Sequence, residues 1–196
     1  MSEKIMRNAQ ITRKTNETII TVALNLDSHA PGNIQTGIGF LDHMLTLFAF
    51  RAGITLNVTC DGDLRVDGHH TVEDIGIVLG QAIAQALGDR NGIRRYGQAS
   101  IPMDESLAHC VMDFSRPFLV FNVRLPSQRA GDFDTELAEE FFRAIAYNGG
   151  ITLHINVAYG KNTHHIIEAV FKAFGCAFKQ AVALTETGIS STKGVL

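Results

Sequence analysis

Four of the eight histidines occur in two adjacent pairs, and a glutamate follows each pair at the same spacing. The two copies are His69-His70-x-x-Glu73 and His164-His165-x-x-Glu168. In a helix, residues three or four apart share a face, so each glutamate can approach a histidine of its own pair. Imidazole nitrogens and carboxylate oxygens together suit a divalent metal of intermediate hardness. Adjacent histidines point in different directions, so one cluster could serve two ions.

A single histidine pair is also typical of a helix start, a surface feature or a hydrogen-bonded core pair. Cysteine is absent from both clusters, which argues against a structural thiolate zinc site. The pattern also differs from the H-E-x-x-H of metalloproteases, in which two histidines on one helical face bind one zinc. Because the cluster occurs twice with the glutamate at one offset, the sequence favours a pseudo-symmetric centre with two metals.

The chain carries an internal repeat. Gly53-Ile-Thr-Leu56 recurs as Gly150-Ile-Thr-Leu153, and Gly80 matches Gly175 in the register of the histidine pairs. The first register places His43 opposite Glu140, and both residue types can bind metal. Taken alone, His43 also fits a capping or surface residue, and Glu140 a solvated face near a helix start. Each half therefore contributes one upstream polar residue and one downstream cluster.

Apolar periodicity predicts the secondary structure. We expect strands at 4–14, 17–26, 53–60, 105–113, 117–125 and 150–157, and helices at 40–51, 70–88, 135–147 and 163–184. These elements predict an α+β fold built from a duplicated ββαβα unit, with two four-stranded sheets that each carry helices on one face. The expected units are a first half at 1–92, a second half at 93–187 and a tail at 188–196 that contacts substrate.

Composition excludes several classes of protein. The 196 residues are 45% hydrophobic and 19% charged, with a net charge of −3, so a packed core is expected and a nucleic-acid partner is not. Apolar runs are too short to span a bilayer, and the start lacks the apolar stretch of a secretory signal. The odd number of cysteines (Cys60, Cys110 and Cys176) lacks metal-type spacing and predicts reduced thiols in a cytoplasmic protein.

Basic and hydroxyl side chains form a second candidate set, with chemistry that suits a phosphate. Its members are Arg51, Arg95, Arg116, Lys172 and the run Ser191-Thr192-Lys193. The run is not a nucleotide P-loop, because G-x-x-x-x-G-K-[ST] is absent. Each residue alone also fits an ordinary surface position.

Five segments together resemble the monofunctional imidazoleglycerol-phosphate dehydratase family of histidine biosynthesis. They are GFLDHML (39–45), DGHHTVEDIGIVLG (67–80), GITLHI (150–155), GKNTHHIIEAVFKAF (160–174) and STKGVL (191–196). The resemblance implies a ribosomal-protein-S5-domain-2-like fold and a hydro-lyase that converts imidazole glycerol phosphate to imidazole acetol phosphate. It also implies two Mn²⁺ ions per active site and a large homo-oligomer, a 24-mer built from trimers, whose active sites are shared between subunits.

The resemblance also assigns roles to residues. The implied metal ligands are His43, His69, His70, Glu73, Glu140, His164, His165 and Glu168. Members of the family often have histidine where this chain has Glu140, so ligation there depends on a carboxylate instead. The implied substrate contacts are Glu17, Arg95, Arg116, Ser191, Thr192, Lys193 and the stretches 43–51 and 164–172, which contain Arg51 and Lys172. Glu17, His43, Glu73 and Glu168 are the implied catalytic residues.

The chemistry explains why two metals are needed. The hydrogen that is eliminated lies on a carbon without an adjacent carbonyl, so only the imidazole ring can accept electrons. Two Mn²⁺ ions, one at each ring nitrogen, would hold the ring as a bridging imidazolate. The hydroxyl could then leave, a base could remove the neighbouring proton, and the enol would become a ketone. The resemblance makes Glu17 the preferred acid-base residue, whereas the residues alone fit a solvent-facing strand start.

Two other functions fit the residues. A dinuclear hydrolase of phosphate esters would release phosphate, whereas a dehydratase retains phosphate and forms a ketone. A metal-storage or assembly protein would use its ions only to hold subunits together. It would show no enzymatic activity, and the substitution His70→Ala would dissociate its oligomer.

Overall fold

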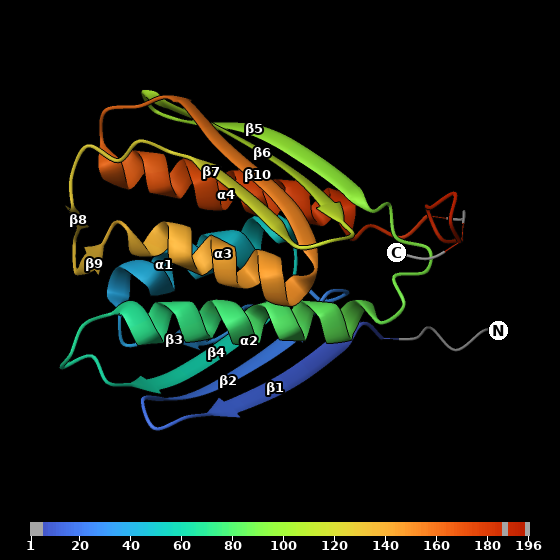
Figure 1. Cartoon of the computed structure of the whole chain (residues 1–196), viewed down its shortest axis with the longest axis horizontal. Helices are drawn as coiled ribbons and strands as arrows, with labels where there is room; N and C mark the ends of the chain where they lie inside the picture. The colour runs from blue at the N-terminus through green and yellow to red at the C-terminus, as the bar shows by residue number, and fades with distance from the viewer. Residues whose placement is uncertain (1–5, 186–187, 195–196) are drawn as a thin grey trace.

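Two four-stranded sheets form the outer layers of the molecule in the computed structural model, which describes residues 6–185 and 188–194 (Figure 1). The first sheet contains β1 (Asn8–Lys14), β2 (Thr18–Asn25), β4 (Thr55–Gly62) and β3 (Ile34–Gln35), in that spatial order. The second contains β5 (Tyr96–Met103), β6 (Ser106–Phe114), β10 (Ile151–Tyr159) and β7 (Phe118–Asn122). A short hairpin of β8 (Arg129–Ala130) and β9 (Phe133–Asp134) follows β7.

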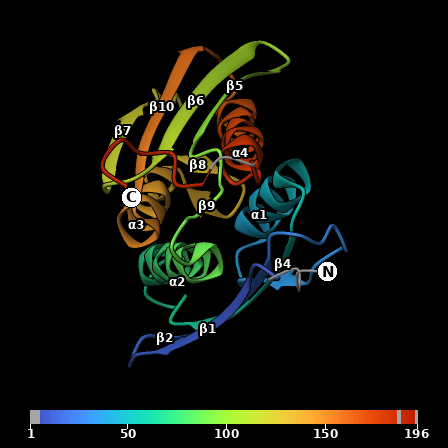
Figure 2. The same ribbon diagram turned by 90° about the vertical axis from the view of Figure 1, so that its right-hand side faces the viewer.

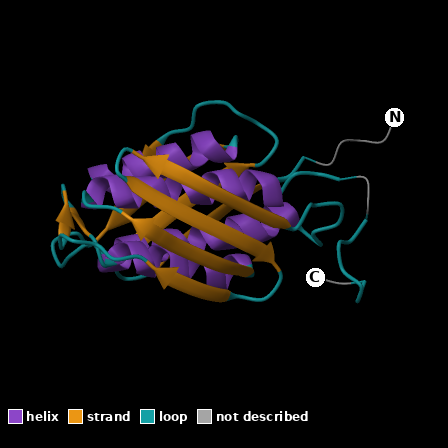
Figure 3. Ribbon diagram, turned by 90° about the horizontal axis from the view of Figure 1, so that it is seen from above, coloured by secondary structure: helices purple, strands orange, loops and turns teal. Residues whose placement is uncertain are grey.

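Four helices fill the space between the sheets (Figures 1 and 2). They are α1 (Gly39–Ala52), α2 (His69–Leu87), α3 (Leu137–Gly149) and α4 (Thr163–Ala181). Helix α2 packs against α3, and α1 packs against α4, so each contact joins the two halves of the repeat. Figure 3 shows the second sheet lying across the helices. The expected α+β class, with two four-stranded sheets and helices on one face of each, is confirmed.

The two sheets share one topology, which agrees with a duplicated ancestor. Each four-stranded sheet contains one strand more than the predicted ββαβα unit, β3 in the first sheet and β5 in the second, and the hairpin of β8 and β9 is a further addition in the second half. Strand β3 is only two residues long. Strand β5 contains Gly97 and Pro102, which normally mark turns, and it is an edge strand, where proline is tolerated. The predicted helix at 163–184 ends at Ala181.

Glycines bring the helices of the two halves close together. A Cβ atom on Gly175 of α4 would lie 2.9 Å from the carbonyl oxygen of Phe48 on α1. A Cβ atom on Gly80 of α2 would lie 2.9 Å from the backbone nitrogen of Gly149 on α3. Only glycine allows such backbone approaches. Gly80 and Gly175, which the repeat matches, therefore have the same role: each allows the close approach of two helices.

Apolar side chains between the layers form one continuous core. The predicted stripe of α2 is buried throughout: Ile75, Val78, Leu79, Ile83 and Leu87. Phenylalanines join α1 to α4, with the rings of Phe48 and Phe174 stacked at 5.0 Å between centroids. Each such buried side chain contributes about 1.5–3 kcal/mol. No helix in the described part of the chain is long and apolar enough to cross a membrane.

Candidate metal centre and anion pocket

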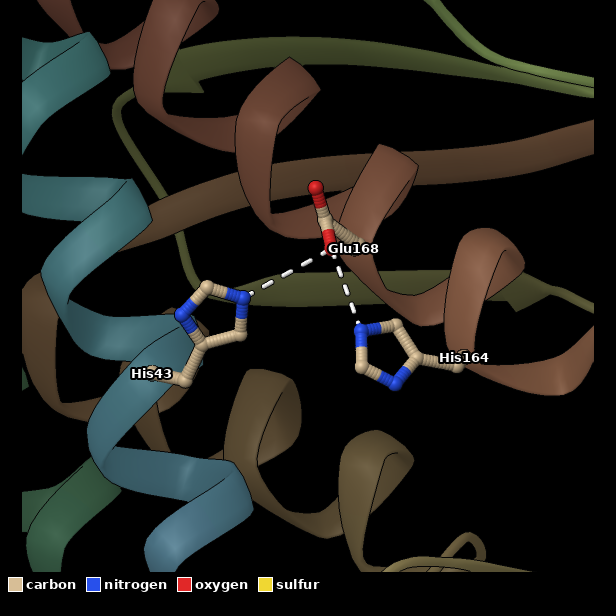
Figure 4. Close-up of side chains that lie close together, drawn as sticks. All are labelled: His43, His164 and Glu168. Carbon is tan, nitrogen blue, oxygen red and sulfur yellow. Dashed lines mark hydrogen bonds and ion pairs between the residues drawn. The ribbon is translucent and has the colours of Figure 1, made fainter.

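Three side chains from the two halves meet where α1 crosses the start of α4 (Figure 4). The Glu168 Oε2 atom lies 3.2 Å from His164 Nε2 and 3.6 Å from His43 Nε2. Among the described residues, these three form the one group whose ligand atoms all lie within 4.8 Å of one another. Two imidazole nitrogens and a carboxylate oxygen suit a divalent cation, so this triad fits a metal ion.

The start of α4 is capped, and the cap orients the histidine pair. The side chain of Asn162, the N-cap residue, accepts hydrogen bonds from the backbone nitrogens of His164 and His165. The edge of the His164 ring contacts the ring of Phe40, with 5.1 Å between centroids. Local capping and one aromatic contact therefore fix the direction in which His164 points.

Glu168 is buried, with only 7% of its surface exposed. Burial alone raises the pKa of this carboxyl, but the hydrogen bond and charge of Lys172, together with smaller contributions from His164 and His43, outweigh burial, and the net pKa is lowered. The Lys172 Nζ atom lies 2.6 Å from Glu168 Oε1. Lys172, expected to contact substrate, therefore holds the oxygen that faces away from the histidines and keeps the carboxylate ionised.

The first half presents a similar pair at the start of α2. His69 Nε2 lies 3.9 Å from Glu73 Oε2, at the same helical spacing as His164 and Glu168. Glu140, the counterpart of His43, lies on α3, and its carboxylate is 3.4 Å from Arg143 Nε. Within the described residues of one chain, Glu140 does not complete a triad with His69 and Glu73.

The second histidine of each pair is held by a carboxylate that the sequence patterns did not identify. His70 Nδ1 lies 3.0 Å from Asp63 Oδ2, and the hydrogen bond from His70 to Asp63 raises the histidine pKa. His165 Nδ1 lies 2.7 Å from Glu105 Oε2, and this hydrogen bond likewise raises the pKa of His165. In the sequence, Asp63 and Glu105 are recognisable only as acidic residues near the end of a strand.

Glu17 lies in the turn between β1 and β2. This turn is at the same end of the molecule as the starts of α2 and α4, which carry the histidine pairs (Figure 1). The Glu17 Oε1 atom is 3.8 Å from His70 Nε2, and 52% of the Glu17 side chain is exposed. Thr15 Oγ1 accepts a hydrogen bond from the backbone nitrogen of Glu17, which fixes the turn. The structure therefore places the expected acid-base residue beside one histidine and open to solvent.

The remaining basic and hydroxyl candidates, except Arg51, gather in a pocket of about 360 Å³ near the C-terminal tail. Its lining comprises Arg95, Asp113, Ser115, Arg116, Ser191, Thr192 and Lys193. Asp113 accepts hydrogen bonds from the Arg95 guanidinium at 2.6 and 3.1 Å. The lining as a whole contains three cationic groups and one carboxylate. Hydroxyls and cations in this balance suit a phosphate group. The last two residues of the tail motif, 195 and 196, lie outside the described residues.

The metal triad and the anion pocket lie at opposite ends of α4. His164 is near the start of the helix, whereas the backbone nitrogen of Arg95 donates to the carbonyl of Ala181 at its end. At about 1.5 Å per residue, the two ends are about 25 Å apart. Arg51 lies in the last turn of α1, over the ring of Phe50 at 5.5 Å. A small substrate therefore cannot contact both the metal triad and the anion pocket of the same chain.

Comparisons with known proteins agree with these features. The family model described as "Imidazoleglycerol-phosphate dehydratase" matches residues 36–178. The chain is 58% identical over 194 residues to imidazoleglycerol-phosphate dehydratase of Listeria welshimeri, covering 97% of this chain and 100% of that protein. It is 56% identical over 191 residues to the protein of that name from Exiguobacterium, covering 96% and 98%.

Two solved structures share the fold. Imidazoleglycerol-phosphate dehydratase from Staphylococcus aureus superposes with a TM-score of 0.83 at 46% identity, covering 91% of this chain and 99% of that one. The Pyrococcus furiosus protein, in complex with (S)-C348, gives a TM-score of 0.83 at 39% identity, covering 95% and 100%.

Proposed function

The chain belongs to the imidazoleglycerol-phosphate dehydratase family, and we propose that it removes water from imidazole glycerol phosphate in histidine biosynthesis. The product would be imidazole acetol phosphate. One structural observation carries the proposal: His43, His164 and Glu168 converge on a single point from two helices, as a metal-dependent lyase requires. The pocket with phosphate chemistry supports a phosphorylated substrate.

The proposed metal is Mn²⁺, with two ions in each active site. The ligands would be the triad together with His69, His70, Glu73, His165 and Glu140. Carboxylates and imidazoles are both good manganese ligands. Bound there, the two ions would supply the Lewis acidity that stabilises the imidazole ring of the substrate as an imidazolate held between them.

The protein's own residues would perform the remaining steps. Arg95, Arg116 and the run from Ser191 to Lys193 would hold the phosphate and so orient the glycerol chain. Glu17 would move the proton at the carbon next to the departing hydroxyl, because its exposed carboxylate lies beside His70 Nε2. The ion pair with Lys172 engages one oxygen of the Glu168 carboxylate, so the other oxygen would remain available to a cation.

The proposed assembly is a large homo-oligomer, a 24-mer built from trimers, with active sites shared between copies. The separation of the triad and the anion pocket within one chain supports sharing, because the two features can serve one substrate only if different copies supply them. Residues 188–194 of one copy would then contact the substrate bound at another copy's metals. The three unpaired cysteines favour a reducing cytoplasm.

The direct test is incubation of the purified protein with imidazole glycerol phosphate, with and without Mn²⁺. A ketone that retains the phosphate and forms only with metal is the expected product. Release of inorganic phosphate would indicate a phosphate-ester hydrolase instead, and absence of a metal-dependent ketone would refute the dehydratase. The variant Glu17→Gln should bind Mn²⁺ normally and lose about 10²–10⁴-fold in turnover.

A further inference from the structure

Both carboxylate oxygens of Glu105 are occupied by groups at the start of α4. Oε1 accepts hydrogen bonds from the backbone nitrogens of Asn162 at 2.7 Å and Lys161 at 3.0 Å. It also accepts the Ser106 hydroxyl at 3.1 Å, while Oε2 lies 2.7 Å from His165 Nδ1. The two backbone nitrogens and the Ser106 hydroxyl are all donors, so the Glu105 side chain acts as an acceptor, as an ionised carboxylate does.

An ionised carboxylate can only accept hydrogen bonds, so the contact at 2.7 Å places a proton on His165 Nδ1. In the neutral ring the lone pair is then on Nε2, which points away from Glu105 towards Asp104, 3.7 Å away. Histidines that bind metals commonly donate their other N–H group to a carboxylate in this way, and the contact fixes the tautomer and the ring orientation.

The internal repeat allows the contact between Glu105 and His165 to be compared with its equivalent in the first half. The Gly-Ile-Thr-Leu register aligns Val58 of β4 with Ile155 of β10, and their cross-strand partners are Val22 and Cys110. Five residues before these partners lie Glu17 and Glu105, so the two glutamates occupy the same position in the two halves.

The equivalent glutamates nevertheless face opposite nitrogens. Glu105 lies on the Nδ1 side of His165, whereas Glu17 lies on the Nε2 side of His70. In the first half, Asp63, the residue directly after β4, lies 3.0 Å from His70 Nδ1. A carboxylate therefore holds Nδ1 in both halves, and the use of Asp63 leaves Glu17 open for chemistry.

We propose that Glu105 is a positioning residue that locks His165 in the tautomer with a protonated Nδ1 and so presents Nε2 to a metal ion. This inference rests on the proposed function, because it takes His165 as a ligand. Nothing in the family match or in the residue patterns assigned a role to Glu105.

Two substitutions separate this role from a simple tether for the loop before α4. In Glu105→Gln, the amide oxygen can keep the bonds to the nitrogens of Lys161 and Asn162, which turns the amide NH₂ towards His165. That group donates, so Nδ1 must accept and the proton moves to Nε2, where it blocks the metal. Glu105→Ala removes the loop contacts and leaves the ring free to adopt either tautomer.

The measurement is titration of the metal-free protein with Mn²⁺, with the free ion followed by electron paramagnetic resonance, and thermal unfolding of each variant. Glu105→Gln should unfold close to the wild-type temperature and bind Mn²⁺ about 10- to 100-fold more weakly. Glu105→Ala should unfold at a lower temperature yet retain more affinity than the glutamine variant. Glu136→Gln, which removes the same charge at the start of α3, should bind Mn²⁺ like the wild type.

Wild-type affinity in Glu105→Gln, or a loss only in Glu105→Ala, would show a tether and overturn the inference. An equal loss in Glu136→Gln would show a general effect of charge and would also overturn it. In both cases the wild type still binds Mn²⁺ and turns over substrate, so the proposed function survives. Failure of the wild type itself to bind Mn²⁺ would remove the proposed metal centre, and the role of Glu105 with it.

Discussion

The ammonium of Lys172 lies 2.6 Å from one oxygen of Glu168, and the other oxygen of that carboxylate faces His164 and His43. Both partners of the ion pair are largely buried. A buried carboxylate without a counter-charge is costly, so Lys172 stabilises the metal-free triad. A bound cation would supply a second positive charge on the opposite side of the carboxylate.

The variant Lys172→Met tests this arrangement. It keeps the length of the side chain and removes the charge, and we expect it to lower the free energy of unfolding of the metal-free protein by about 3 kcal/mol. Adding Mn²⁺ should recover part of that loss, because binding to the folded state adds stability. Urea denaturation with and without Mn²⁺ measures both effects. The double variant Lys172→Met/Glu168→Gln should lose less than Lys172→Met, and additive losses would contradict the pairing.

Gly175 controls how closely α1 and α4 approach. A valine there would press on the Phe48 carbonyl, so Gly175→Val should destabilise the protein by about 1–3 kcal/mol and move His43 away from Glu168. Mn²⁺ affinity should fall together with stability. Gly88→Ala is a control, because nothing lies within 4 Å of a Cβ at that position, where only the positive φ opposes the change. A Gly175→Val protein with wild-type Mn²⁺ affinity would contradict the role of the close helix contact.

The sequence predicted the parts of the fold that depend on local pattern. The buried stripe of α2 has helical periodicity, and the repeat correctly placed Gly80 and Gly175 in equivalent helices. Strand β5 escaped detection because its glycine and proline imitate a turn, although its position at the sheet edge tolerates both. Pairing with β6, rather than local propensity, determines that strand.

The candidate site was predictable where its residues share a helix. Spacing predicted that one histidine of the pair lies beside Glu168, which in the structure is His164, but the position of His43 depends on how α1 crosses α4. Glu105 is 60 positions from His165, and no periodic signal joins them. Contacts of this kind come from tertiary packing, so sequence patterns alone could not reveal them.

The thiols provide a test of burial through pH. Burial raises the pKa of Cys60 to about 11 and also raises the pKa of Cys110. An unfolded thiol loses its proton near pH 8.5, so between about pH 8.5 and 11 the unfolded state binds fewer protons and the free energy of unfolding falls as pH rises. In a Cys176→Ser background, iodoacetamide should modify the native protein slowly at pH 8 and faster towards pH 11. Modification at pH 8 at the rate of the urea-unfolded chain would contradict the burial.

The role of Glu140 determines whether the first-half cluster binds a metal ion as the second-half cluster is proposed to do. If Glu140 binds metal, Glu140→Ala should reduce the content from about two Mn²⁺ ions per chain to about one, and Glu140→His should restore it. Elemental analysis of the purified protein measures the ratio. Glu139→Gln is the matched control, because Glu139 lies 2.6 Å from Arg143 on the same helix turn. Full metal content in Glu140→Ala would show that water or another residue takes that position.

The distance between the triad and the anion pocket predicts complementation between inactive chains. His164→Ala should remove the triad and leave the pocket intact, whereas Arg95→Ala should do the reverse. Each variant alone should be inactive. When the two are unfolded together and reassembled, some sites would combine an intact triad from one chain with an intact pocket from another. Random mixing of equal amounts would restore about a quarter of the wild-type activity if two copies build each site, and less if three do.

Two controls make this complementation decisive. Mixing the separately assembled variants without unfolding should restore no activity, because assembled oligomers are expected to exchange subunits slowly. The double variant His164→Ala/Arg95→Ala, reassembled with wild-type chains, should give less activity than the same amount of wild-type chains assembled alone. Each double-variant chain would supply a defective triad to one site and a defective pocket to another. Co-assembled single variants that stay inactive would show that each chain builds its own active site. That outcome would require the tail and Arg95 to serve some purpose other than binding the phosphate of the substrate.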